Sequence, residues 1–144
     1  MTLAEYTRGL LGLAVTSAWL SLAASAIGNG VPSNSDGWQI PESAAAESNP
    51  EPNNAAVLAK GLSLYRAKCQ RCHGVDGSGH GPDADPDHPA GNLTDQRVAA
   101  RNPDGVLFYK IWNGRAKPKM PAMKVDLMRT DVWMIVQYVK TLRK

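Results

Sequence analysis

The sequence predicts an all-α fold, and the prediction rests on helical periodicity at both ends of the segment 55–144. In the first predicted helix, which runs into Cys69, residues recur at the spacing of one helical face: Leu58, Gly61, Leu62 and Tyr65. The last predicted helix, residues 130–142, repeats that spacing: Ile135, Tyr138, Val139 and Leu142. Short alternating patterns typical of β-strands are absent from the sequence. We therefore expect helices only.

The helix boundaries follow from local signals. A middle helix is predicted over residues 103–112, because Pro103-Asp104 favours a helix start and Asn113-Gly114 a stop. For the last helix, Thr130 or Asp131 is expected to cap the N-terminus. Basic residues near its end complement the helix dipole: Lys140, Arg143 and Lys144. Gly61, in mid-helix, costs about 1 kcal/mol relative to alanine. We expect that cost to reflect close approach of the last helix.

The most specific motif is Cys69-Gln70-Arg71-Cys72-His73, which contains the only two cysteines of the chain. This C-x-x-C-H spacing is the attachment motif of covalent haem c. On one helical turn, each thiol can add to one vinyl group of a porphyrin, and the adjacent histidine lies under the iron. The motif therefore predicts one covalently bound haem c.

Three other interpretations of these residues were weighed. A redox dithiol would normally accompany a βαβ pattern, which this chain lacks. A zinc site could use both cysteines and two of His73, His80 and His88, but the Pro- and Gly-rich surroundings fit no familiar finger spacing. A structural disulfide between Cys69 and Cys72 is the third. Haem attachment is favoured over all of them.

The N-terminus, residues 1–26, is predicted to be an export signal. Arg8 precedes an apolar stretch that ends in Ala24-Ser25-Ala26, which resembles a cleavage site. We expect cleavage after Ala26, and an uncleaved membrane anchor is the alternative. In both cases the rest of the chain is expected in the periplasm, free or tethered to the outer face of the inner membrane.

Residues 27–54 are predicted to be a Pro/Ser/Asn-rich tether to a domain at 55–144. Within the tether, the apolar segment Trp38-Gln39-Ile40-Pro41 is expected to dock on the domain. The first 54 residues carry one basic and five acidic side chains, a net −4, whereas residues 55–144 carry fifteen basic and eight acidic ones, a net +7. Because no nucleic-acid motif accompanies the positive charge, an acidic protein partner is the better interpretation.

Residues 55–144 resemble a class I c-type cytochrome, a small single-haem protein of the bacterial periplasm. The matching segments occur in the order of that family: Gly61-x3-Tyr65, Cys69 to Gly74, Gly77 to Pro82, Asn92-Leu93-Thr94-Asp95, Gly114, Met120-Pro121-Ala122 and Asp131-x-Trp133 with Tyr138. The resemblance implies three main helices around the haem, with the first and last crossing at Gly61.

The resemblance also implies particular roles for residues of the haem site. The sixth iron ligand in this family usually precedes Pro-Ala, which favours Met120, with Met123 as the alternative. The carbonyl of Pro82 in Gly81-Pro82 is expected to accept the second ring N–H of His73. His80 and His88 are expected to be surface residues, and Asp83, Asp85 and Asp87 a solvated loop rather than a calcium site.

Together these features predict one-electron transfer with His73 and Met120 as axial ligands, rather than catalysis by the chain itself. Basic residues on either side of Met120 are expected to form a docking ring for an acidic redox partner: Lys110, Arg115, Lys117, Lys119 and Lys124. The chain is either a free carrier or a subunit of a larger complex. The alternative is a haem enzyme or gas sensor with an open sixth position.

Overall fold

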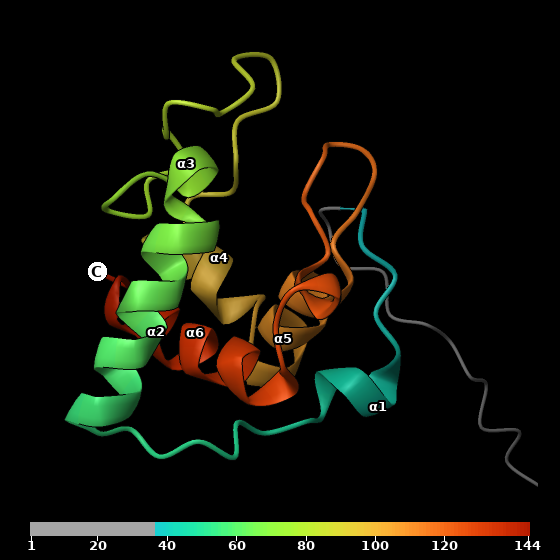
Figure 1. Ribbon diagram of the computed structural model, residues 1–144. Coiled ribbons are helices and arrows are strands. Elements are labelled where there is room, and N and C mark those ends of the chain that lie inside the picture. The colour runs from blue at the N-terminus through green and yellow to red at the C-terminus, as the bar shows by residue number, and fades with distance from the viewer. Residues whose placement is uncertain (1–36) are drawn as a thin grey trace, which may run out of the picture.

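The computed structural model describes residues 37–144, in which every regular element is a helix (Figure 1). The elements are α1 (Glu42–Ala45), α2 (Ala55–Lys68), α3 (Gln70–His73), α4 (Gln96–Ala100), α5 (Asp104–Asn113), the 3-10 helix η1 (Met123–Val125) and α6 (Arg129–Thr141). The all-α prediction is confirmed. The predicted signal or anchor at 1–26 lies outside the described residues. Among residues 37–144, no helix combines the length and the apolar character needed to cross a bilayer.

Helices α2 and α6 cross at Gly61. A Cβ atom placed on this glycine would collide with the carbonyl oxygen of Met134 and lie 2.9 Å from Cβ of Tyr138. The ring of Tyr138 also lies against Tyr65, with 5.2 Å between centroids. The helices therefore approach closely only because residue 61 has no side chain, which confirms the predicted reason for this glycine.

Helix α6 begins earlier than predicted. Its N-cap is Met128, whose backbone N–H donates to Oδ2 of Asp131 at 3.2 Å. The expectation that Thr130 or Asp131 would itself be the cap is thus wrong by two or three residues. Asp131 lies one turn inside the helix and reaches back, which still places a carboxylate at the positive end of the helix dipole.

The main core lies where α5 and α6 pack together. The rings of Phe108 and Trp133 stack with centroids 4.0 Å apart, and Val132 and Ile135 are completely buried beside them. The other buried members of this cluster come from α2, α5, η1 and α6: Tyr65, Leu107, Ile111, Met123, Val136 and Val139. This core supports the ends of the helices that border the cavity described below.

The segment 37–41, called the strap here, packs on the helices as predicted. Trp38 is 8% exposed and Ile40 2%, and both pack against Val106 of α5. Helix α1, which the sequence analysis did not predict, follows the strap. Pro41 provides its N-cap, and the carbonyl of Pro41 accepts N–H groups of Ala44 and Ala45.

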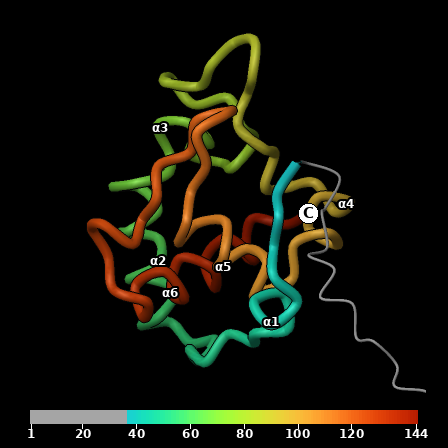
Figure 2. Tube along the Cα trace, turned by 90° about the vertical axis from the view of Figure 1, so that its right-hand side faces the viewer, coloured from blue at the N-terminus to red at the C-terminus, as the bar shows by residue number. Residues whose placement is uncertain are grey.

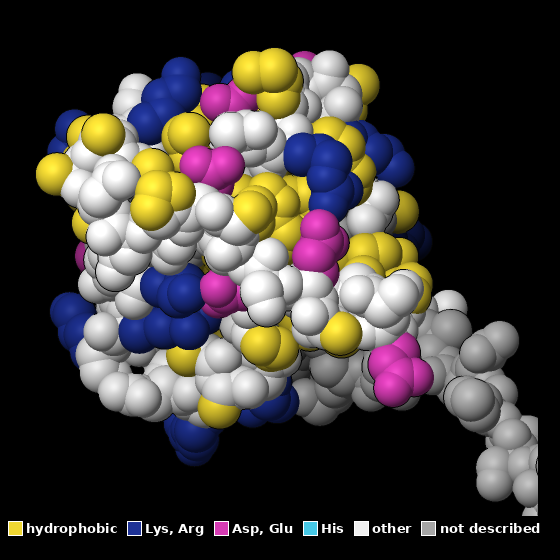
Figure 3. All heavy atoms as spheres, turned by 90° about the horizontal axis from the view of Figure 1, so that it is seen from below, with side chains coloured by type: hydrophobic (Ala, Val, Ile, Leu, Met, Phe, Trp, Pro, Cys, Tyr) yellow, Lys and Arg dark blue, Asp and Glu magenta, His cyan; other side chains and the backbone are white. Residues whose placement is uncertain are grey.

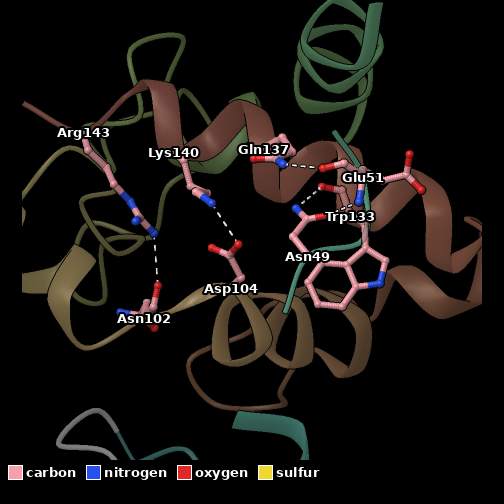
Figure 4. Close-up of polar contacts among 8 residues, drawn as sticks. All are labelled: Asn49, Glu51, Asn102, Asp104, Trp133, Gln137, Lys140 and Arg143. Carbon is pink, nitrogen blue, oxygen red and sulfur yellow. Dashed lines mark hydrogen bonds and ion pairs between the residues drawn. The ribbon is translucent and has the colours of Figure 1, made fainter. Parts of the chain in front are cut away.

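The chain between α1 and α2 runs along α6 and is held to it by side chains. Nδ2 of Asn49 donates to the carbonyl of Trp133 at 3.0 Å, and Nε2 of Gln137 donates to the carbonyl of Glu51 at 2.6 Å (Figure 4). Residues 49 and 51 of the predicted tether are thus joined to α6 by hydrogen bonds.

Candidate haem-binding site

The C-x-x-C-H motif forms a tight turn at the end of α2. The backbone N–H of Cys69 donates to Tyr65 in α2, and the carbonyl of Cys69 accepts from Cys72 at 3.2 Å and from His73 at 3.0 Å. The two cysteines are not bonded to each other, and both line one cavity together with His73. The motif thus presents two thiols and one imidazole to the same space.

The glycine-rich loop after the motif holds α3 in place. Backbone N–H groups of Gly79, Gly81 and Asp83 donate to the carbonyls of His73, Cys72 and Arg71 at 2.8, 3.0 and 2.7 Å. A side chain at Gly81 would collide with the carbonyl of Arg71, so this close approach requires glycine. The backbone carbonyls at the end of α3, which have no partner within so short a helix, thus accept hydrogen bonds from the loop that follows it.

Tyr65 adds a further hydrogen bond to the turn. Its hydroxyl donates to the carbonyl of Gly74 at 2.7 Å, directly after the motif. Burial raises the pKa of this phenol above its ordinary value, so the hydroxyl stays protonated and remains a donor. Burial, and secondarily the charge of Cys72, raises the pKa of the Cys69 thiol to about 12.

The imidazole of His73 lies close to a backbone carbonyl. Nδ1 lies 3.2 Å from the carbonyl oxygen of Gly91, and burial lowers the pKa of the imidazole. A neutral ring whose Nδ1 carries the proton keeps the lone pair of Nε2 for a metal. The role expected for the carbonyl of Pro82 stays a prediction, and the N–H of neighbouring Gly81 donates to the carbonyl of Cys72 in α3.

A cavity with two lobes lies between the loop that follows α3 and the loop that follows α5. The first lobe, about 460 Å³, is lined by the motif, by residues between 83 and 91 and by the segment around Met120. Figure 2 shows the loops that follow α3 and α5 at the same end of the molecule. The second, about 380 Å³, shares five residues with it: His73, Pro89, Gly91, Arg115 and Met120. His73 and Met120 thus line both lobes.

Two of the chain's methionines contribute to the cavity, and they differ in their surroundings. Met120 is half-buried, and its backbone N–H and carbonyl pair with those of Arg115 at 2.9 and 2.8 Å. Gly114, at φ 58°, allows the close approach of Met120. Met123 lines only the first lobe and belongs to the core, at 7% exposed. Met120 therefore lies at the junction of the two lobes, whereas Met123 is a core residue.

The donor set fits a covalent haem c. Two thiols at the required spacing, an imidazole with Nε2 available and a thioether surround a single cavity. Residues 37–144 contain no group of three or more His, Cys, Asp or Glu side chains placed to hold a metal ion, so the zinc and calcium interpretations gain no support. His80 and His88 are exposed, and Oδ1 of Asp85 accepts the backbone N–H groups of Asp87 and His88.

The predicted docking ring is only partly at the surface. Lys117, Lys119 and Lys124 are exposed, whereas Lys110 is 7% exposed and donates to Oδ1 of Asn102 at 2.7 Å. The assignment of Lys110 to a surface ring is therefore wrong. It lies one turn after Val106 on the buried face of α5, and a ring residue would need the opposite face. On the face seen from below, away from both loops, basic and acidic side chains are interspersed (Figure 3).

Several residues that line the second lobe were not predicted to be part of the site: Trp38, Arg101, Asn102 and Arg143. Trp38 was recognised as an apolar docking residue, but nothing in the sequence places its ring beside Met120. Arg101 and Arg143 belong to helix ends distant in sequence, so no local spacing connects them.

Comparisons with known proteins agree with this geometry. Residues 56–139 match the family described as "Cytochrome C oxidase, cbb3-type, subunit III". The solved structure "KustC0563 c-type cytochrome" is similar, with a TM-score of 0.51 and 30% sequence identity over 58% of this chain and 98% of that one. No curated protein matches the chain. Because the family match covers more than half of the 144 residues, this chain belongs to the cbb3-type subunit III family of cytochrome domains, and it is a class I c-type cytochrome with the all-α fold of that class.

Proposed function

We propose that this chain is a one-electron carrier with one haem c, attached through Cys69 and Cys72 and ligated by His73 and Met120. The observation that carries the proposal is the position of His73 and Met120 on both lobes of a cavity that the two cysteines also line. With two protein ligands on the iron, no position would remain for a substrate. The bound haem supplies the redox chemistry, a reversible one-electron change at iron.

The protein's own contribution is to keep the ligands in place during that change. His73 is held by Gly91, its turn is held by the amides of Gly79 and Gly81, and Met120 is held by the paired backbone of Arg115. Rigid ligands reduce the rearrangement that accompanies electron transfer. The core of α5 and α6 provides the support for both loops.

We also propose that the chain is exported and works at the outer face of the inner membrane, as a fixed or tethered component of a redox complex. The family name refers to a subunit of an oxidase, and the N-terminal sequence has the features of a signal or anchor. In either arrangement the chain passes electrons and performs no catalysis alone.

The test of the ligand set is the optical spectrum of the haem-loaded wild-type protein in its ferric and ferrous forms. We expect a weak far-red sulfur-to-iron band in the ferric form and no binding of carbon monoxide by the ferrous form. Carbon monoxide binding without that band would instead indicate an open sixth position, and the enzyme or sensor function would replace the carrier.

The turn between the paired residues Arg115 and Met120 carries two exposed lysines, Lys117 and Lys119. We propose that this turn is the docking site of the acidic partner. The double variant Lys117→Glu/Lys119→Glu is expected to slow electron exchange with a small anionic iron complex several-fold at low salt, and the effect should disappear at high salt. The matched control is Lys60→Glu/Arg66→Glu, which changes net charge equally at exposed positions of α2. Equal slowing by both pairs would show that only total charge matters and would contradict a local docking site.

A further inference from the structure

The second lobe of the cavity is bordered by four basic side chains: Arg101, Lys110, Arg115 and Arg143. No acidic residue of the described chain lines this lobe, whereas Asp83 and Asp85 line the first. The second lobe is therefore suited to an anionic group, and it lies next to both expected iron ligands.

The position of the cysteines indicates which part of the porphyrin would enter this lobe. Cys69 and Cys72 line the first lobe but not the second. The vinyl groups that bond to the cysteines and the two carboxylate side chains lie on opposite halves of the porphyrin. With the haem attached at Cys69 and Cys72, the basic side chains of the second lobe would be the residues that hold its carboxylates.

Two of these basic residues are arranged around Trp38 of the strap. Nζ of Lys110 lies 5.4 Å and Cζ of Arg115 4.8 Å from the centroid of the indole, both within the range of a cation–π contact. Trp38 itself lines the second lobe and is nearly buried. One ring therefore holds two like charges at the same side of the cavity, which would otherwise repel each other.

Asn102 contacts two of the four basic residues of the lobe. Its side-chain oxygen accepts from Lys110 at 2.7 Å, and its backbone carbonyl accepts from Nη2 of Arg143 at 3.1 Å. Figure 4 shows Arg143 reaching Asn102 from the end of α6. The side chain of Lys110 thus lies between the amide of Asn102 and the indole of Trp38.

We propose that the strap is a working part of the haem site: Trp38 closes the second lobe and positions Lys110 and Arg115 beside the porphyrin carboxylates, and this raises the reduction potential. Trp38 lies outside residues 56–139, so the family match does not include it. The inference rests on the proposed haem attachment. Positive charge and exclusion of water both disfavour the ferric form, whose net charge is one unit more positive than that of the ferrous form.

The test is the reduction potential of full-length, haem-loaded Trp38→Ala. We expect the ferric-to-ferrous ratio at a fixed solution potential to rise about tenfold, which is about 59 mV for a one-electron couple. Trp38→Phe keeps an aromatic face for the cations and should restore most of the potential. Ile40→Ala is the matched control, since it loosens the same strap at a residue that does not line the lobe.

If Trp38 has a positioning role, its effect on the reduction potential must depend on the positive charges of Lys110 and Arg115. Lys110→Met should lower the potential alone, and the double variant with Trp38→Ala should shift it by less than the two single shifts combined. An unchanged potential in Trp38→Ala, or equal shifts in Trp38→Ala and Ile40→Ala, would overturn the proposal.

Failure of this inference can be separated from failure of the proposed function. The sulfur-to-iron band and the absence of carbon monoxide binding report on Met120, and they should be unchanged in Trp38→Ala. Loss of that band in the variant would overturn the inference, because Trp38 would then be holding the ligand loop rather than the charges. A wild type without the band would contradict the Met120 ligand alone, and the charge effect on the potential would still be measurable.

Discussion

Met120→Ala is expected to remove the far-red sulfur-to-iron band and to let the ferrous protein bind carbon monoxide. Met120 is the half-buried methionine on both lobes of the cavity, and alanine leaves the sixth iron position without a protein ligand. Because a methionine ligand raises the reduction potential, we expect the potential to fall by on the order of 0.1 V, within the ~0.8 V range that axial ligands set. Spectra and potentiometric titration measure both effects.

Met123→Ala is the matched comparison, because it removes a methionine from the same segment. Met123 is packed in the core with Ile111, so its loss is expected to lower the free energy of unfolding by about 2–5 kcal/mol. The sulfur-to-iron band should remain. If Met123→Ala instead removes the band and Met120→Ala keeps it, the assignment of the sixth ligand is reversed.

Gly61→Ala is expected to destabilise the fold, although alanine is the better helix former. Helix propensity alone would favour alanine by about 1 kcal/mol. The new Cβ, however, meets the backbone of Met134, which cannot turn aside as a flexible side chain could. Overpacking costs typically 1–3 kcal/mol, and a backbone obstacle places this site at the upper end, so we expect a net loss of about 2 kcal/mol.

Urea unfolding of the haem-loaded protein measures this loss. Ser63→Ala is the control, because Ser63 is exposed on the same helix and the change should alter stability by no more than about 0.5 kcal/mol. An increase in stability for Gly61→Ala would show that α6 can move away from α2 at little cost, and the close crossing would then not be required.

The parts of the fold that the sequence predicted are those determined by local spacing. The apolar spacing around Tyr65 predicts α2, and the unfavourable Gly61 predicts the crossing with α6, because a costly residue needs a tertiary reason. The Cys69–His73 motif carries its chemistry within five residues. Each of these features can be recognised without knowledge of distant contacts.

Contacts between distant segments could not be predicted from the sequence. The carbonyl oxygen 3.2 Å from Nδ1 of His73 belongs to Gly91, eighteen residues further along the chain, and loop geometry rather than local sequence brings it there. Lys110 was assigned to the surface by its charge, although its position one turn after Val106 places it on the buried face of α5. The spacing of Lys110 from the apolar residues of α5 predicts its burial better than its charge does.

The docking of the strap also determines the direction in which the upstream chain is connected. Trp38 lines the second lobe, so the described chain begins beside the cavity. In Figure 2 the start of the described chain and α1 lie at opposite ends of the segment that joins them. If the haem binds in this cavity as proposed, a membrane or subunit that binds the chain upstream of Gly37 would be attached to the domain beside the haem. Such an attachment would hold the haem close to a partner on the same membrane or subunit.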